Sequence, residues 1–145
     1  MSTTSALGDR SFRTETFSTP VTAPPLHVDL DEPIDLASLL RRCLDDVTFC
    51  GMILHKFAAR SSDQLAALER ALESGNAIEL AREAHTLQGV AANMSAAAMR
   101  ARADDLERAA RAGDLSAARK LYAAARGEVD RCRLAVPELL LRLAH

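Results

Sequence analysis

This sequence has few aromatic residues and little net charge, and this composition excludes several classes of protein. Aromatic side chains make up 3% of the 145 residues, and tryptophan does not occur. The formal net charge of −2 provides no basic footprint for nucleic acid. No apolar run approaches the ~18 residues that a transmembrane helix needs. We therefore expect neither nucleic-acid binding nor membrane insertion.

Cysteine and targeting segments are also scarce. Cys43, Cys50 and Cys132 are odd in number and form no CxxC pair. We therefore expect reduced, packed thiols rather than a disulfide framework. The N-terminus has no apolar stretch of the signal-peptide kind, so the expected location is the cytoplasm.

Alanine, leucine and charged residues are present in the proportions typical of helical proteins. Hydrophobic residues make up 48% of the chain and charged residues 26%, a mixture that favours helix over sheet. Residues 1–32 are rich in Ser, Thr and Pro without helical periodicity, so we predict a flexible tail or linker there. Residues 33–145 show helical periodicity and are predicted to form one domain.

Capping residues divide the front of this domain into two helices. A short helix is predicted to begin near Pro33–Asp35, and Asp45 or Asp46 is predicted to cap the next one. That second segment runs to Gly75. Within it, Ser61–Asp63 is either an exposed turn of one long helix or a break between two. The apolar stripe of the segment is predicted to comprise Phe49, Ile53, Phe57, Leu65, Leu68 and Leu72.

Three further helices follow from similar signals. Asn76, with Glu79 as its capping-box partner, is predicted to cap a helix that runs to about residue 94. Ser95 is predicted to cap the next helix, and Gly113–Asp114 marks the start of the last one. The last helix has apolar spacings that alternate three and four, until Pro137 interrupts it. The pattern predicts an all-α protein, a monomeric antiparallel four-helix bundle with a short preceding helix.

The helix that begins after Asn76 carries a glycine in its interior beside a histidine. Gly89 costs a helix roughly 1 kcal/mol relative to Ala, and it lies one turn after His85 on the same face. The apolar stripe lies on the other side of a helical wheel, so His85 is predicted to point outward. Around His85 we predict a docking face flanked by Arg82 and Gln88 and formed by Ile78, Ala81, Gly89 and Ala92.

An outward imidazole with open space beside it can carry a phosphoryl group. The unperturbed pKa of imidazole is about 6.5, so its neutral, nucleophilic form dominates at pH 7. Such a nitrogen can attack phosphorus and hold the phosphoryl group covalently. The bare Gly89 leaves room for phosphate oxygens or for an approaching partner. Gln88 can donate a hydrogen bond to phosphate, and Arg82 can add positive charge from the other side.

Residues around His85 resemble the signature of a known family. Ala84–Ala96 reads AHTLQGVAANMSA, which resembles the AH-x-L-K-G-x-[AS]-x-x-[apolar]-G-A signature of histidine-containing phosphotransfer (HPt) domains. Downstream, Ala103–Glu107 followed by Gly113–Asp114 is similar to the family's A-x-x-LE…G-D segment. With the long helix before the signature, the resemblance covers about residues 34 to 132.

This resemblance implies a four-helix bundle with one phosphorylatable histidine, His85. It implies that the partners are response-regulator receiver domains or hybrid sensor histidine kinases. An aspartyl phosphate of one receiver would supply the phosphoryl group, and a second receiver would take it. The resemblance also implies a carrier rather than an enzyme, with no ATP site and no cofactor, because the Mg²⁺ belongs to the receiver.

Two positions depart from the family pattern. Gln88 stands where the family usually has lysine, and glutamine can only hydrogen-bond to phosphate. Either Arg82 compensates for the missing charge or transfer is slow. Ser95 stands where the family often has glycine, and we interpret this change as harmless because serine is a good N-cap. We interpret the charged residues of the following helix as solvated surface: Arg100, Arg102, Asp104, Asp105, Glu107, Arg108 and Arg111.

Three other functions compete with phosphotransfer. A module that docks receivers but transfers poorly is favoured by Gln88 and opposed by His85. A structural helical adaptor predicts that His85→Gln has no consequence. A di-iron bundle needs repeated Glu-x-x-His pairs, but Arg82 stands three residues before His85 and Met52 stands three before His55. We therefore expect no metal site. The sequence also has no glycine-rich phosphate loop or nucleophile motif of a hydrolase.

Overall fold

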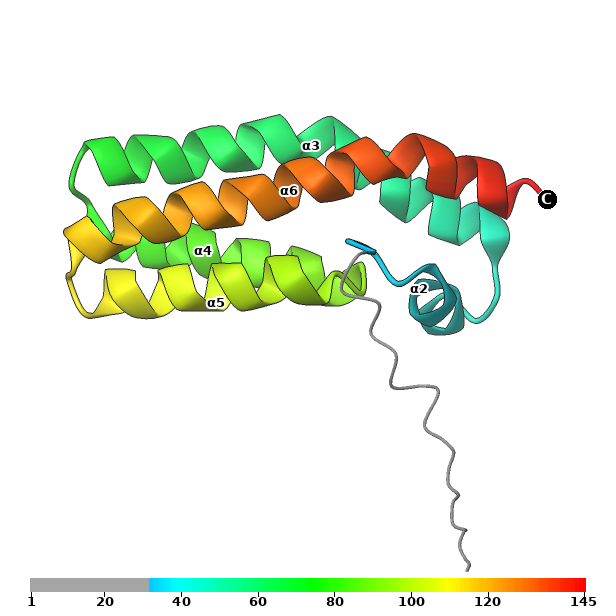
Figure 1. Ribbon diagram of the computed structural model, residues 1–145, viewed down its shortest axis with the longest axis horizontal. Helices are drawn as coiled ribbons and strands as arrows, with labels where there is room; N and C mark the ends of the chain where they lie inside the picture. Colours follow the sequence, from blue (N-terminus) through cyan, green and yellow to red (C-terminus); the bar gives the residue numbers. More distant parts are fainter. Residues whose placement is uncertain (1–31) are drawn as a thin grey trace, which may run out of the picture. The chain divides into compact units, whose positions relative to one another are not determined.

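The computed structural model describes residues 32–145, which form one compact unit. Apart from Glu32, the flexible tail or linker predicted at 1–32 lies outside these residues. The helices of the described part are α2 (Leu36–Arg42), α3 (Val47–Glu73), α4 (Ala77–Asn93), α5 (Ala97–Arg111) and α6 (Leu115–Leu143) (Figure 1).

Four of these helices form an antiparallel bundle. Each of α3, α4 and α5 packs against the next helix in the chain, and α6 closes the ring against α3 (Figure 1). The short helix α2 lies at one end of the bundle and packs against α3. The predicted all-α bundle with a short preceding helix is therefore confirmed. No helix within residues 32–145 is long and apolar enough to cross a membrane.

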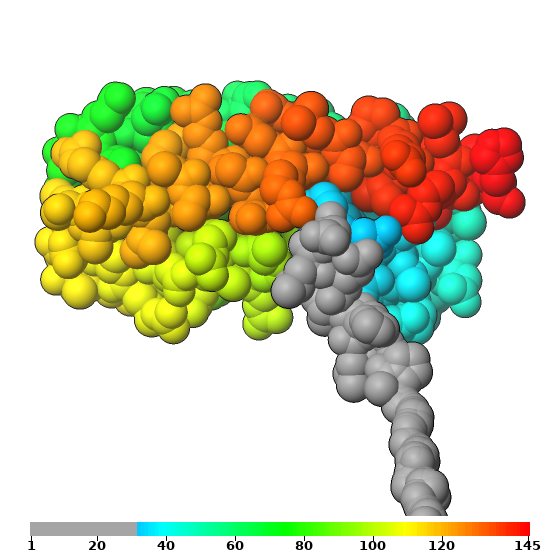
Figure 2. Space-filling view, in the orientation of Figure 1, coloured from blue at the N-terminus to red at the C-terminus, as the bar shows by residue number. Residues whose placement is uncertain are grey.

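The core is built from leucine and alanine, as the composition predicts. Because alanine adds little bulk, the α4–α5 and α5–α6 pairs approach closely, and side chains fill the space between α5 and α6 in Figure 2. Cys43, Cys50 and Cys132 are buried and unpaired, which confirms the prediction of packed thiols. Burial raises the pKa of the Cys132 thiol to about 12, which leaves it unreactive. The fully buried leucines are Leu39, Leu54, Leu68, Leu80, Leu87 and Leu106.

Aspartate and asparagine begin four of the five described helices. The Asp46 carboxylate accepts a hydrogen bond from Phe49 N at 3.0 Å, so Asp46 caps α3. The Asn76 side chain accepts from Glu79 N at 3.0 Å, which confirms the predicted cap of α4. The capping box is not completed, because Asn76 N donates to Ala71 O at 2.9 Å and the Glu79 carboxylate pairs with Arg82. Asp35 and Asp114 cap α2 and α6 in the same way.

Two sequence expectations about the long helices are wrong, and one open question is answered. The α3 helix runs unbroken through Ser61–Asp63, so that segment is no break. Phe49 is 49% exposed rather than part of the core, because Cys50 and Leu54 take the buried positions of the first turns. Pro137 does not interrupt α6, which continues to Leu143. Pro137 is exposed, and the burial of Val136 and Leu139 beside it holds the last turns onto the bundle.

Ser95 ends α4 rather than capping α5, so our interpretation of this residue is wrong. Its φ of +58° lies in the left-handed region, and Ala96 N bonds to Ala91 O at 2.9 Å. This pattern is a Schellman motif, in which glycine is the preferred residue at the left-handed position. The cap of α5 is Ala96, which makes no side-chain capping bond. Serine here is therefore strained, and its hydroxyl bonds to the Ser38 hydroxyl at 3.1 Å.

Replacing Ser95 with glycine is expected to stabilise the domain. The left-handed conformation costs a non-glycine residue about 1–2 kcal/mol, and part of the gain is offset by the lost Ser38 hydrogen bond. We expect Ser95→Gly to raise the free energy of unfolding by about 0.5–1 kcal/mol, measured by urea denaturation. The matched control is Gly113→Ser, because Gly113 has a φ of +73° after α5. That variant should lose stability, and a Ser95→Gly variant that also loses stability would contradict this account.

Candidate functional site

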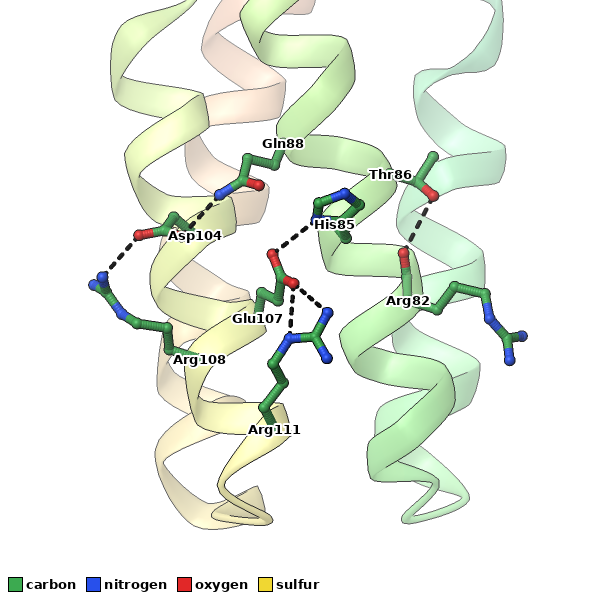
Figure 3. A network of polar contacts seen from close by, with 8 residues as sticks. All are labelled: Arg82, His85, Thr86, Gln88, Asp104, Glu107, Arg108 and Arg111. Carbon is green, nitrogen blue, oxygen red and sulfur yellow. Dashed lines mark hydrogen bonds and ion pairs between the residues drawn. The ribbon is translucent and has the colours of Figure 1, made fainter.

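His85 lies on the outer face of α4, and its side chain is 67% exposed. The helix buries its opposite side in the bundle through Leu80, Ala84, Leu87 and Ala91. The 3.6-residue period then directs His85 away from the core, toward the surface shared with α5 (Figure 3). The imidazole is thus accessible to a partner while its helix is held rigidly.

Glu107 of α5 contacts the imidazole from one side. His85 Nδ1 lies 3.1 Å from Glu107 Oε1, and the Glu107 carboxylate is itself buried. Its other oxygen accepts hydrogen bonds from Arg111 Nε at 2.8 Å and Arg111 Nη2 at 2.6 Å. Figure 3 shows the carboxylate between the imidazole and the guanidinium. Glu107 therefore fixes the orientation of the histidine ring.

The charge of Glu107 determines which imidazole nitrogen is free. Burial alone would raise the pKa of the Glu107 carboxyl, but the hydrogen bonds and charges of Arg111 and His85 lower it below its ordinary value. An ionised carboxylate only accepts hydrogen bonds, so a neutral His85 must carry its proton on Nδ1. Its Nε2 then holds a lone pair in the exposed part of the ring. This arrangement provides a nucleophile that needs no further deprotonation.

Glu107 is expected to make stability depend on pH. Its pKa is lowered in the folded protein, so its contribution is fully present above the unfolded value of about 4.3 and is lost as the pH falls through the folded value. Relative to Glu107→Gln, the wild type should gain about 1–2 kcal/mol of unfolding free energy at pH 7. This gain should shrink below about pH 4. Urea denaturation of both proteins across this range measures it, and a gain that grows toward acid pH would contradict the assignment.

A second polar contact joins α4 to α5 one turn from His85. Gln88 Nε2 donates to Asp104 Oδ1 at 2.8 Å, and Asp104 Oδ2 pairs with Arg108 Nη1 at 2.9 Å (Figure 3). The sequence predicts that Gln88 donates a hydrogen bond to phosphate, but in the structure its amide donates to Asp104. A phosphoryl group at His85 would have to compete with this contact.

Arg82 lies on the other side of His85 and is directed away from it. Its guanidinium pairs with Glu79 on the same helix, and its carbonyl accepts a hydrogen bond from the Thr86 hydroxyl at 3.1 Å. Figure 3 shows the side chain extending away from α5. The cation nearest the Glu107–His85 contact is that of Arg111 rather than Arg82.

Three of the four predicted docking residues lie at the surface. Ile78 is 76% exposed, Gly89 is exposed, and Ala92 is half-buried. A Cβ built on Gly89 meets nothing within 4 Å, so the space beside His85 is open. The prediction for Ala81 is wrong, because it is only 5% exposed. Ala81 lies on the side of α4 that faces α5, and the close packing of these helices covers it.

Asp104, Glu107 and Arg111 contribute to the site, although the sequence pattern predicts only solvated surface at these positions. A signal was present in the spacing. Glu107 follows the buried Ala103 by four residues and precedes the buried Ala110 by three, which places it at the edge of the apolar stripe. A carboxylate at that position needs a partner, and His85 and Arg111 provide it.

Side chains that could bind a metal ion are not clustered in the described part of the chain. Within residues 32–145, no three His, Cys, Asp or Glu side chains are arranged to hold a metal ion. His55 is exposed on α3, so it adds nothing to the His85 site that would suggest a di-iron bundle.

The fold and the exposed histidine agree with comparisons to known proteins. The profile of the Hpt domain matches residues 52–144, so this chain belongs to the Hpt domain family. The solved structure of histidine-containing phosphotransfer protein B (HptB) from Pseudomonas aeruginosa PAO1 is similar, with a TM-score of 0.67 and 29% identity. The match covers 76% of this chain and 96% of HptB. No curated protein sequence matches significantly. The predicted resemblance is confirmed, and it supports histidine phosphotransfer in a phosphorelay.

Proposed function

We propose that His85 accepts a phosphoryl group from the aspartyl phosphate of one receiver domain and passes it to another. The observation that carries this proposal is the geometry of the imidazole. Glu107 Oε1 lies 3.1 Å from Nδ1, while the ring as a whole is exposed. This arrangement fixes one nitrogen and leaves Nε2 open to a partner.

The transfer forms one bond and breaks one. The lone pair of His85 Nε2 attacks phosphorus, and the bond from phosphorus to the receiver's aspartyl oxygen breaks. The electron pair of that bond returns to the aspartate, which leaves as a carboxylate. The ring then carries the phosphoryl group on Nε2 and a proton on Nδ1. Transfer to a second receiver reverses these steps, with the second aspartate as nucleophile.

Glu107 supports both directions of this transfer. The phosphorylated ring gains positive charge while Nδ1 stays protonated, and the Glu107 carboxylate is already in place to stabilise that charge. Arg111 holds the carboxylate by two hydrogen bonds, so little reorganisation is needed during the reaction. We expect no ATP site, no kinase activity and no cofactor on this chain, with Mg²⁺ bound by the receiver alone.

The docking face follows from the exposure of α4. Ile78 and Gly89 lie on the same side of the helix as His85. An exposed isoleucine provides apolar contact area, and the missing side chain at Gly89 lets the receiver's aspartate approach in line with Nε2. Receiver domains, either separate or within a hybrid histidine kinase, are the partners that this face fits.

A relay experiment tests this proposal. A receiver charged with labelled phosphate is mixed with a second, unlabelled receiver, with and without this protein. We expect label on the second receiver only when the protein is present, with transient label on the protein itself. Label that moves equally well without the protein, or never moves, would exclude the relay function.

A receiver-docking module that transfers slowly is the second candidate. It is favoured by the Gln88–Asp104 hydrogen bond. Position 88 is a glutamine rather than a lysine, so it brings no positive charge to a phosphoryl group on His85. Calorimetric titration with a receiver separates binding from transfer. Tight binding without label on His85 would support the docking module.

A further inference from the structure

The polar residues between α4 and α5 form two parallel contacts. His85 and Gln88 are three residues apart on α4, and each contacts one carboxylate of α5: Glu107 at 3.1 Å and Asp104 at 2.8 Å. The two carboxylates are likewise three residues apart, so they occupy one face of α5 (Figure 3). Two negative charges therefore line the side of the site that faces α5.

Arginines of the same helix balance these charges. Asp104 pairs with Arg108 at 2.9 Å, and Glu107 pairs with Arg111 at 2.6 Å. On α4, Arg82 is paired with Glu79. A phosphoryl group on His85 would thus meet arginines that already bind carboxylates. Each of these arginines must leave its carboxylate partner before it can stabilise the phosphoryl group.

We propose that Asp104 keeps the lifetime of phosphorylated His85 short by holding the side chain at position 88 against α5. The inference rests on the proposed function, because it concerns the same phosphorylated histidine. What it adds to that function is a coupling between the side chains at positions 88 and 104. With Asp104 in place, residue 88 is drawn away from the phosphoryl group, and the negative charge of Asp104 repels the phosphoryl oxygens.

This coupling makes a specific prediction for a lysine at position 88. The ammonium would be attracted to the Asp104 carboxylate that now holds the Gln88 amide, because an ion pair with this carboxylate is stronger than a hydrogen bond from a neutral amide. Gln88→Lys alone should therefore give the phosphoryl group little of the added charge. Once Asp104→Asn removes the competing carboxylate, the same lysine is free to contact the phosphoryl oxygens.

The experiment measures loss of the phosphoryl group by hydrolysis. Water attacks phosphorus, the bond from phosphorus to Nε2 breaks, and its electron pair returns to the ring as inorganic phosphate leaves. Potassium phosphoramidate phosphorylates histidine without a receiver, so the other three histidines (His27, His55 and His145) are replaced by glutamine in every protein compared. Intact-mass spectrometry then follows the decay at His85 alone. Wild type, Gln88→Lys, Asp104→Asn and the double variant are compared at pH 7.5. Thermal melting confirms that each is folded, as expected for Asp104, whose side chain is 40% exposed.

We expect Asp104→Asn alone to lengthen the lifetime about twofold, Gln88→Lys alone to leave it nearly unchanged, and the double change to lengthen it about tenfold, which corresponds to one charge-assisted hydrogen bond. An unchanged lifetime in Asp104→Asn would contradict the role proposed for Asp104. The matched control is Asp105→Asn. Asp105 also pairs with Arg108, at 2.7 Å, but it has no contact with Gln88, so combining it with Gln88→Lys should add nothing.

Two results would overturn the coupling. One is a Gln88→Lys lifetime equal to that of the double variant, and the other is a double variant whose gain is only the product of the single gains. Either can occur while receivers still label His85, so the proposed function would survive. Conversely, a protein that no receiver labels still yields the lifetimes after treatment with phosphoramidate.

Discussion

Gly89→Glu should abolish transfer from a charged receiver while making the protein slightly more stable. Gly89 lies on the exposed face of α4, one turn after His85, and a Cβ there meets nothing within 4 Å. A glutamate side chain would occupy the space through which phosphate oxygens approach and would add a like charge. Misplacement of the reacting groups by about 1 Å already costs roughly 100-fold in rate, so we expect at least that loss.

The expected gain in stability separates this effect from misfolding. Replacing glycine in an exposed helix interior adds about 0.5–1 kcal/mol of stability. Gly127 is the matched control, because it is exposed on α6 and a Cβ there also meets nothing within 4 Å. The α6 helix packs on α3 and α5. Gly127→Glu should therefore gain the same stability and transfer normally. Normal transfer by Gly89→Glu would contradict the docking face proposed around His85.

Glu107→Ala should slow phosphoryl acceptance by about 10- to 100-fold, comparable to the loss when the group that orients a metal-bound histidine is removed. The variant removes the acceptor at Nδ1 and leaves Arg111 without its carboxylate. An unrestrained imidazole favours the proton on Nε2, which is the nitrogen that must attack. Single-turnover transfer from a charged receiver measures the rate.

The tautomer of His85 distinguishes orientation from general damage. Nitrogen NMR of the imidazole should show the proton on Nδ1 in wild type and mainly on Nε2 in Glu107→Ala. Arg111→Ala is a useful comparison, because it keeps the carboxylate at Nδ1 and should preserve the tautomer with a smaller loss of rate. If the tautomer is the same in wild type and Glu107→Ala, the role assigned to Glu107 is wrong.

Properties that belong to one helix could be predicted from the sequence. The apolar stripe of α4 directs His85 outward, and the structure places it there. Asn76 begins α4 because its side chain bonds to the backbone three residues on. Both features depend on helical periodicity and local hydrogen bonding, which a sequence pattern contains directly.

Properties that depend on two helices could not be predicted in the same way. Ala81 is buried and Gln88 is engaged because α5 packs closely on that side of α4. Glu107 becomes part of the site for the same reason. A helical wheel for α4 describes the sides of one helix but not the position of its neighbour, so it treats the two flanks of His85 as equivalent.

Ser95 shows a third limit, which concerns backbone conformation. Serine is a common N-cap, whereas the left-handed position at the end of a helix usually takes glycine. The choice depends on the φ of one residue, which is +58° here. A hydrogen bond from Asp35 N to Ser95 O at 3.0 Å fixes this turn against the start of α2. That contact joins residues far apart in the sequence, so local patterns do not contain it.

Labelling of His85 by a charged receiver tests the central claim most directly. Receiver domains carrying labelled phosphate are mixed with wild type and with His85→Gln, and the label is tested for stability in acid and base. We predict acid-labile, base-stable label on wild type and none on His85→Gln, with both proteins folded. Equal label on both proteins, or none on wild type from any receiver of the same organism, would contradict the assignment of His85 as the phosphoryl acceptor.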